Sequence, residues 1–141
     1  MDELLIEPAE KNKKKIAIIV GIIVAVIAIA LIIFIPSKFE RVKNRCVEIA
    51  GMVSGSGDYF EIDTYPEHVF PQMEFMADEL EDGALEAIKY ANEALGFNGS
   101  VYSRMLNTTA LMGRQSEENS KYRISWTYHP NSGLEVTYEK K

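Results

Sequence analysis

One apolar run of 20 residues, 16–35, constrains the fold of this chain more than any other feature of its sequence. The run has no charged or polar side chain, and Gly21 is its only member that is not hydrophobic. As a helix rising about 1.5 Å per residue it would be about 30 Å long, the thickness of a bilayer's hydrocarbon core. Because backbone amides in lipid must bond within their own segment, we predict an uninterrupted transmembrane helix over residues 16–36.

Cleavage of this run as a signal peptide is the main alternative, because Ala28-Ile29-Ala30 has the A-x-A form of a cleavage site. However, five more apolar residues follow it, and no helix-breaking residue comes directly before it. The run also exceeds the ~7–15 residues of a usual signal-peptide core. We therefore predict an uncleaved signal anchor.

Positive charges flank the run, with four bases within ten residues on each side. Flanking bases favour the cytoplasmic side and act most strongly close to the membrane. The closest membrane-flanking bases are Lys13, Lys14 and Lys15 before the run and Lys38 after it. The three adjacent lysines predict a cytoplasmic tail, residues 1–15, and an extracytoplasmic C-terminal domain at the cell membrane. The equal totals leave the reversed topology open.

Hydrophobic spacing after Pro36, which ends the span, first predicts a helix. Apolar residues recur every three or four positions between Phe39 and Val53. We expect a juxtamembrane stalk helix and a flexible loop, together residues 37–57. A separate helical turn is expected over residues 75–80.

Two further helices follow from the same spacing. A stripe of apolar residues predicts a helix over 84–95, with Gly96 placed to end it in the left-handed conformation. Another helix is expected over 100–113, with Ser100 as its N-cap and Gly113 as its C-cap.

Alternation of apolar and polar residues predicts three strands, over 58–65, 122–129 and 134–140. The last two are joined by turn-forming residues at 129–133. The predicted fold class is therefore α+β, in which an N-terminal transmembrane helix precedes a small domain. In that domain, residues 58–141, helices pack on an antiparallel sheet that ends in a C-terminal β-hairpin.

Charge is unevenly distributed in the part of the chain after Pro36, where 17 acidic residues outnumber 11 basic ones. Between residues 58 and 93 there are 11 acidic residues and a single base, Lys89. Such a surface repels phosphate backbones, so we expect no nucleic-acid partner. The bases beside the span instead suit lipid headgroups, which makes the bilayer itself the first expected partner.

Metal and catalytic motifs are absent from the sequence. Residues 78–83 resemble the start of an EF-hand loop, but its third and twelfth positions carry no ligand. Three residues of the zinc-binding types, Cys46, His68 and His129, are not spaced as a pair. No nucleophile motif is present. We expect no metal, no cofactor and no catalytic residues.

Cys46 is the only cysteine, so an internal disulfide is excluded. It lies on the apolar stripe of the expected stalk helix, which predicts a small buried residue. The alternative is a homodimer held through Cys46 or through the span.

The C-terminal hairpin is the candidate partner surface, because aromatic residues gather on it. Its residues are Arg123, Trp126, Tyr128, His129 and Tyr138. If the helices cover the aromatic face, the aromatics form core. If part of the face is open, it would bind a peptide, a glycan or a protein.

The stretch ALMGRQSEENSKYRISWTYHPNSGLEVTYEKK, residues 110–141, resembles the C-terminal ends of small, single-span, uncharacterised bacterial proteins. The helix EAIKYANEALGF, residues 86–97, resembles them more loosely. This resemblance implies a bacterial cell-envelope setting. It carries no known activity, so it assigns no functional residue.

Three functions are compatible with these features. The first is a membrane-anchored, extracytoplasmic domain that binds a protein or an envelope component without catalysis. The second is an accessory subunit of an envelope or membrane assembly, with a pilin-like layout but without the prepilin cleavage motif. The third is an enzyme, for which no catalytic arrangement is visible in the sequence.

Overall fold

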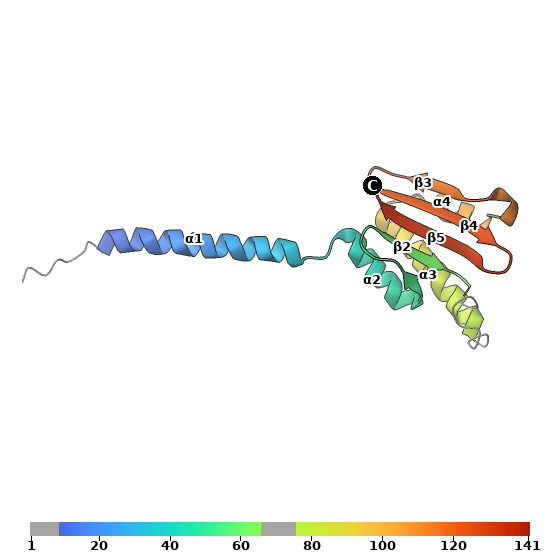
Figure 1. Ribbon diagram of the computed structural model, residues 1–141, viewed down its shortest axis with the longest axis horizontal. Helices are drawn as coiled ribbons and strands as arrows, with labels where there is room; N and C mark the ends of the chain where they lie inside the picture. The colour runs from blue at the N-terminus through green and yellow to red at the C-terminus, as the bar shows by residue number, and fades with distance from the viewer. Residues whose placement is uncertain (1–8, 66–75) are drawn as a thin grey trace, which may run out of the picture. The chain divides into compact units, whose positions relative to one another are not determined.

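The structure, a computed structural model, describes residues 9–65 and 76–141 and divides into two units that meet between Pro36 and Ser37. Helix α1, Ala9–Phe34, forms the described part of the first unit (Figure 1). Its segment Asn12–Phe34 is long and apolar enough to cross a membrane. Residues 9–15, expected as a tail, continue this helix, and residues 1–8 lie outside the described residues.

The second unit has the α+β composition expected from the sequence (Figure 1). Its helices are α2 (Lys38–Ala50), α3 (Ala77–Leu95), α4 (Gly99–Leu106) and the short 3-10 helix η3 (Ala110–Met112). Its strands are β1 (Val53–Ser54), β2 (Tyr59–Asp63), β3 (Gln115–Glu118), β4 (Tyr122–His129) and β5 (Gly133–Lys140). The five strands form one antiparallel sheet in the order β1-β2-β5-β4-β3.

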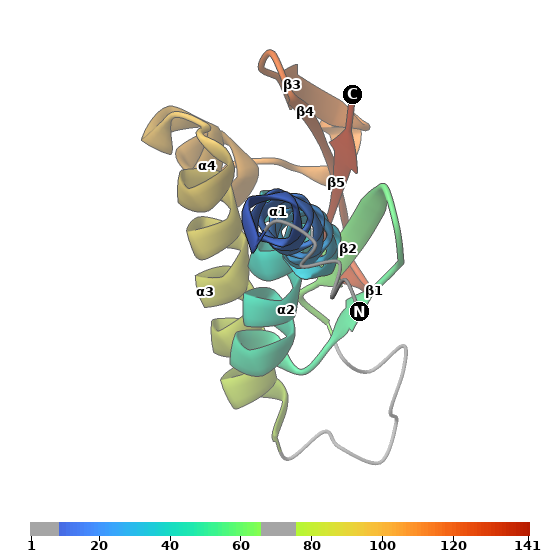
Figure 2. The same cartoon turned by 90° about the vertical axis from the view of Figure 1, so that its left-hand side faces the viewer.

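The helices cover one face of this sheet, as Figure 2 shows, and the core lies between the two layers. Alternate strand residues point into the core, because successive side chains of a strand lie on opposite faces. The buried strand residues are Phe60, Ile62, Ile124, Trp126, Leu134, Val136 and Tyr138. The hairpin β4–β5 and the helical layer were therefore correctly predicted.

Helix α2 belongs to the folded domain and is not a separate stalk. The compact unit begins at Ser37, before the expected domain boundary at residue 58. The Phe39 ring packs on Phe60 with ring centroids 5.0 Å apart and stacks on Tyr122 at 5.6 Å. The helix begins in a capping box, because Ser37 Oγ accepts from the amide of Glu40 and the Glu40 carboxylate accepts from the amide of Ser37.

Helix α3 is one continuous helix, although the sequence suggested a turn over 75–80 and a helix from 84. Gly83 lies inside it, where a Cβ would be 3.3 Å from the carbonyl oxygen of Ile49. A glycine at this position lets α2 and α3 approach closely. The helix ends at Gly96, with φ 84°, as predicted.

The segment after α3 differs from the expected helix over 100–113. Asn98 is the N-cap of α4, because its Oδ1 accepts from the amide of Ser100 at 3.0 Å. The helix ends at Leu106, and Gly113 follows η3 instead. The polar stretch before β4, where the sequence predicted no helix or strand, forms edge strand β3.

Candidate functional site

The expected hairpin surface does not exist as a single surface. Trp126 is 1% exposed and Tyr138 is 0% exposed, so neither side chain can contact a partner in this fold. Both lie on the face of the sheet that the helices cover. Burial of these two aromatic rings confirms the alternative in which the helices cover the aromatic face, and it removes both residues from the candidate partner surface.

Both buried aromatics use their polar atoms within the core. The indole Nε1 of Trp126 donates to Oγ1 of Thr108 at 2.8 Å, and Thr108 Oγ1 in turn donates to the carbonyl of Arg104. The hydroxyl of Tyr138 donates to Oδ1 of Asn92 at 2.8 Å. Burial raises the pKa of Tyr138 well above its usual value. These groups stabilise the fold and are unavailable for binding.

The other three residues of the expected surface are exposed, but they lie apart on β4. Arg123 pairs with Glu118 at 3.3 Å and lies opposite Glu139 near the start of the strand. Tyr128 and His129 lie at its far end, in and beside the turn to β5. Tyr128 and His129 are consecutive residues of β4, so their side chains lie on opposite faces of the sheet, and the three exposed residues form no common surface.

A different apolar surface lies near Tyr128, which we call the distal patch. The name covers four exposed apolar residues of α4, η3 and β4: Leu106 (52% exposed), Leu111 (99%), Met112 (55%) and Tyr128 (36%), of which Leu106 and Tyr128 line one hollow. The α4–β3 connection and the β4–β5 turn lie at the end of the sheet away from the start of α2 (Figure 1). The sequence did not predict this surface, because residues 106–112 were expected to belong to one helix over 100–113.

Two shallow hollows adjoin the distal patch. One, of about 280 Å³, is lined in part by Leu106, Tyr128, Pro130 and Glu81. The other, of about 220 Å³, is lined in part by Met112, whose neighbours there include Arg104 and Asn107. The distal patch therefore combines apolar side chains with hollows and with polar groups at their edges, as protein-binding surfaces do.

The uncovered face of the sheet is polar and carries a carboxylate with a shifted pKa. Burial, followed by the nearby charge of Glu135, raises the pKa of Glu61, while Thr137 donates to its carboxylate at 3.2 Å. Arg114 pairs with Glu135 at 3.0 Å. Among the described residues, no three Cys, His, Asp or Glu side chains cluster as metal ligands would.

The other residues singled out from the sequence are Cys46, His68 and the membrane-flanking lysines. Cys46 is fully buried, as predicted, and burial raises its pKa to about 12. A disulfide through Cys46 would require this domain to open. His68 lies outside the described residues. The membrane-flanking lysines at positions 13, 14, 15 and 38 are all exposed.

Comparison with protein-family models, with curated proteins and with solved structures gives no match for this chain. The resemblance of residues 110–141 to single-span bacterial proteins therefore stays a prediction. The class that the fold defines is a small α+β domain preceded by an apolar helix long enough to span a membrane.

Proposed function

We propose that this chain is a membrane-anchored, extracytoplasmic domain that binds a protein or an envelope component without catalysing a reaction. The observation that carries the proposal is the distal patch, above all Leu111, whose side chain is 99% exposed. Burying a leucine side chain lowers the free energy by about 2 kcal/mol, and the isolated chain lacks this stabilisation at Leu111. A partner that covers Leu111 would recover it.

The length and composition of α1 support the anchoring part of the proposal. Its side chains from Ile16 to Phe34 are exposed almost throughout, which is unfavourable in water and favourable in lipid. Lys13, Lys14 and Lys15 would lie on the cytoplasmic side. The domain that begins at Ser37 would then be extracytoplasmic.

The chemistry of the described residues supports a binding role. The thiol of Cys46 is buried, and its raised pKa keeps it protonated at neutral pH. His129 is exposed at the start of the β4–β5 turn, where no hydrogen bond from another described side chain orients it. The exposed groups of the domain are instead the apolar side chains of the distal patch and several ion pairs, which are the contacts that protein-binding surfaces use.

Site-specific photo-crosslinking in cells tests this function with the full-length chain. A photoreactive residue at Leu111 should yield a discrete adduct, because Leu111 would lie at the centre of the interface. The matched control is Ser116, which is also exposed but lies on strand β3. Met112→Ser should weaken the Leu111 adduct without changing the thermal unfolding of the protein.

The same experiment separates the second candidate function, an accessory subunit that makes its contacts through the anchor. In that case a photoreactive residue at Val24 in α1 would give the main adduct, and Leu111 would give none. The absence of adducts at Leu111 and at Val24 would contradict both binding functions.

A further inference from the structure

We infer that the end of the domain where α2 begins is a membrane-facing surface that binds anionic lipid headgroups. This inference rests on the proposed membrane anchor and deepens it, because it assigns a lipid partner and an orientation to the domain. We call this surface the proximal face. It carries the lysines Lys38, Lys121, Lys140 and Lys141 and the tyrosine Tyr59.

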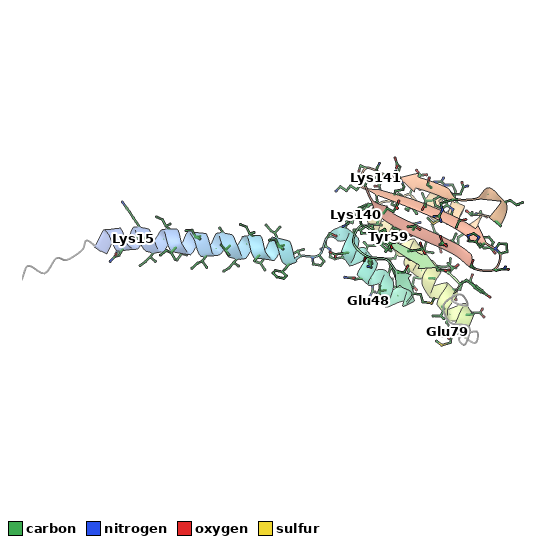
Figure 3. All side chains as sticks on the ribbon, in the orientation of Figure 1. Lys15, Glu48, Tyr59, Glu79, Lys140 and Lys141 are labelled. Atoms are coloured by element: carbon green, nitrogen blue, oxygen red, sulfur yellow. The ribbon has the colours of Figure 1, made fainter. Side chains whose placement is uncertain are left out.

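The four lysines come from three separate parts of the sequence, and the fold brings them together. Lys38 and Lys121 line the same hollow. Lys140 places its Nζ 5.4 Å from the ring centroid of Phe39, the residue after Lys38. The amide of Lys141 donates to the carbonyl of Lys121 at 2.9 Å. Figure 3 shows Lys140 and Lys141 beside the start of α2.

The covalent chain brings this face to the membrane when α1 spans it. Lys38 is three residues after Ile35, so it lies within about 11 Å of the end of the apolar run along the chain. The other three lysines lie at the same end of the domain. Long lysine side chains can then extend to the headgroups while their stems stay on the protein.

Carboxylates at the same end offset much of this positive charge, because Glu40 lies in the first turn of α2 and Glu139 lies opposite Tyr59, in addition to two carboxylates that pair with the lysines. Asp58 pairs with Lys140 at 3.3 Å, and Glu118 pairs with Lys141 at 3.2 Å. Both pairs are partly exposed, so they are weak and can exchange for pairs with phosphates. Lys38 and Lys121 form no ion pair with any described residue and remain available to lipid.

Tyr59 adds a second feature of membrane-facing surfaces. Its side chain is 48% exposed, and Figure 3 places it at the proximal face beside Lys140. Tyrosine is enriched at the membrane–water interface, where its ring lies among headgroups and its hydroxyl stays hydrated. A tyrosine among lysines therefore favours a lipid surface over a purely ionic partner.

The opposite end of the domain lies beyond the reach of the membrane charge. Helix α3 runs away from the proximal face and places Ala77 roughly 27 Å from Leu95. Its first turn carries Asp78 and Glu79, and electrostatic screening acts over about 8 Å at physiological salt. Anionic lipid therefore attracts the proximal face and leaves the distal patch free for a partner.

Fluorescence quenching of the full-length chain in lipid vesicles tests the inference. An environment-sensitive dye is attached to Ser120→Cys at the proximal face or to Asn131→Cys at the distal end, and a quencher is carried on lipid headgroups. Cys46 is buried and should not react. Vesicles are made of phosphatidylcholine alone or with about one third phosphatidylglycerol, which supplies the negative surface.

Quenching at Ser120 should rise about threefold in the anionic vesicles and return to the neutral value in high salt. Quenching at Asn131 should not change. Lys121→Gln should reduce the rise, and adding Lys140→Gln and Lys141→Gln should abolish it. Arg114→Gln, which removes one distal positive charge, should have no effect.

Equal quenching at Ser120 in both kinds of vesicle would overturn the inference, as would an equal response at Asn131. An alkaline wash of the same vesicles tests the anchor separately. If the chain stays bound but quenching at Ser120 does not depend on lipid charge, only the inference about the proximal face is contradicted. A chain that washes off contradicts the membrane anchor as well.

Discussion

The hydroxyl of Tyr138 donates a hydrogen bond of 2.8 Å to Oδ1 of Asn92, and this bond joins strand β5 to helix α3 inside the core. Both side chains are buried, at 0% and 2% exposure. The same hydroxyl lies 3.2 Å from the carbonyl of Ile88, and the Tyr138 ring stacks on Phe60 at 4.8 Å. Tyr138 therefore fixes how the sheet and α3 pack.

Replacing Tyr138 with phenylalanine should destabilise the domain by about 1–3 kcal/mol, because Oδ1 of Asn92 loses its donor and stays buried. Chemical denaturation of the two proteins measures the difference. Tyr122→Phe is the matched control, because no described residue hydrogen-bonds the Tyr122 hydroxyl. Equal stability of Tyr138→Phe and the parent protein would show that the buried bond contributes nothing.

Gly133 begins β5 with a positive φ of 69°, and a Cβ there would lie 2.6 Å from Oγ1 of Thr64. That hydroxyl is buried and accepts from the amide of Leu134. Gly133→Ala should therefore lower the free energy of unfolding by about 1–3 kcal/mol.

Gly57→Ala is the control for Gly133→Ala, because Gly57 has a similar φ of 70° and nothing within 4 Å of its added Cβ. It should cost only the backbone strain, about 1 kcal/mol. The difference between the two variants in thermal unfolding measures the clash with Thr64. Equal losses of stability in the two variants would mean that the β4–β5 turn rearranges to accept the methyl group.

Glu61 should make stability depend on pH. Burial, followed by the charge of Glu135, raises its pKa in the folded state above 4.5. Its protonated form therefore stabilises the fold fully below pH 4.5, and this contribution is lost as pH rises through the raised folded pKa. Glu61→Gln should raise the melting temperature at neutral pH and have little effect below pH 4.5.

Thermal unfolding across pH measures the Glu61 effect. The difference in melting temperature between Glu61→Gln and the parent protein should grow with pH. A Glu61→Gln variant that is less stable than the parent at neutral pH would show that the bond to Thr137 outweighs burial of the charge.

The thiol of Cys46 should be protected in the folded protein. Burial raises its pKa to about 12, and the thiol lies 3.6 Å from the carbonyl of Ala87 in the core. A thiol reagent at neutral pH should label it only after denaturation. Rapid labelling of the native protein, or a disulfide-linked dimer on non-reducing gels, would contradict its burial.

Much of the fold could be predicted because hydrophobic periodicity reports directly which face of an element is buried. The spacing of Phe39, Val42 and Cys46 gave the buried face of α2, and alternation gave β4 and β5. The capping box of Ser37 and Glu40 was visible in the sequence as S-x-x-E but was not used. Local patterns determine these features, so one sequence suffices for them.

The errors arose where tertiary contacts decide the structure. Strand β3 has a polar sequence, and it forms through its pairing with β4 at the edge of the sheet, where Ser116 lies opposite Ser125. Trp126 was placed on the correct face, but the sequence does not show whether helices cover that face. Leu111 fits a helical stripe as well as an exposed turn, so the distal patch could not be found before the fold was known.

The most direct test of the central claim is a pair of C-terminal reporter fusions to the full-length chain, assayed in the membrane fraction. One reporter is active only outside the cytoplasm, and the other is active only inside it. A membrane-anchored extracytoplasmic domain predicts activity of the first reporter alone, retained after an alkaline wash. Activity of the cytoplasmic reporter alone, or release of the fusion into the soluble fraction, would contradict the account.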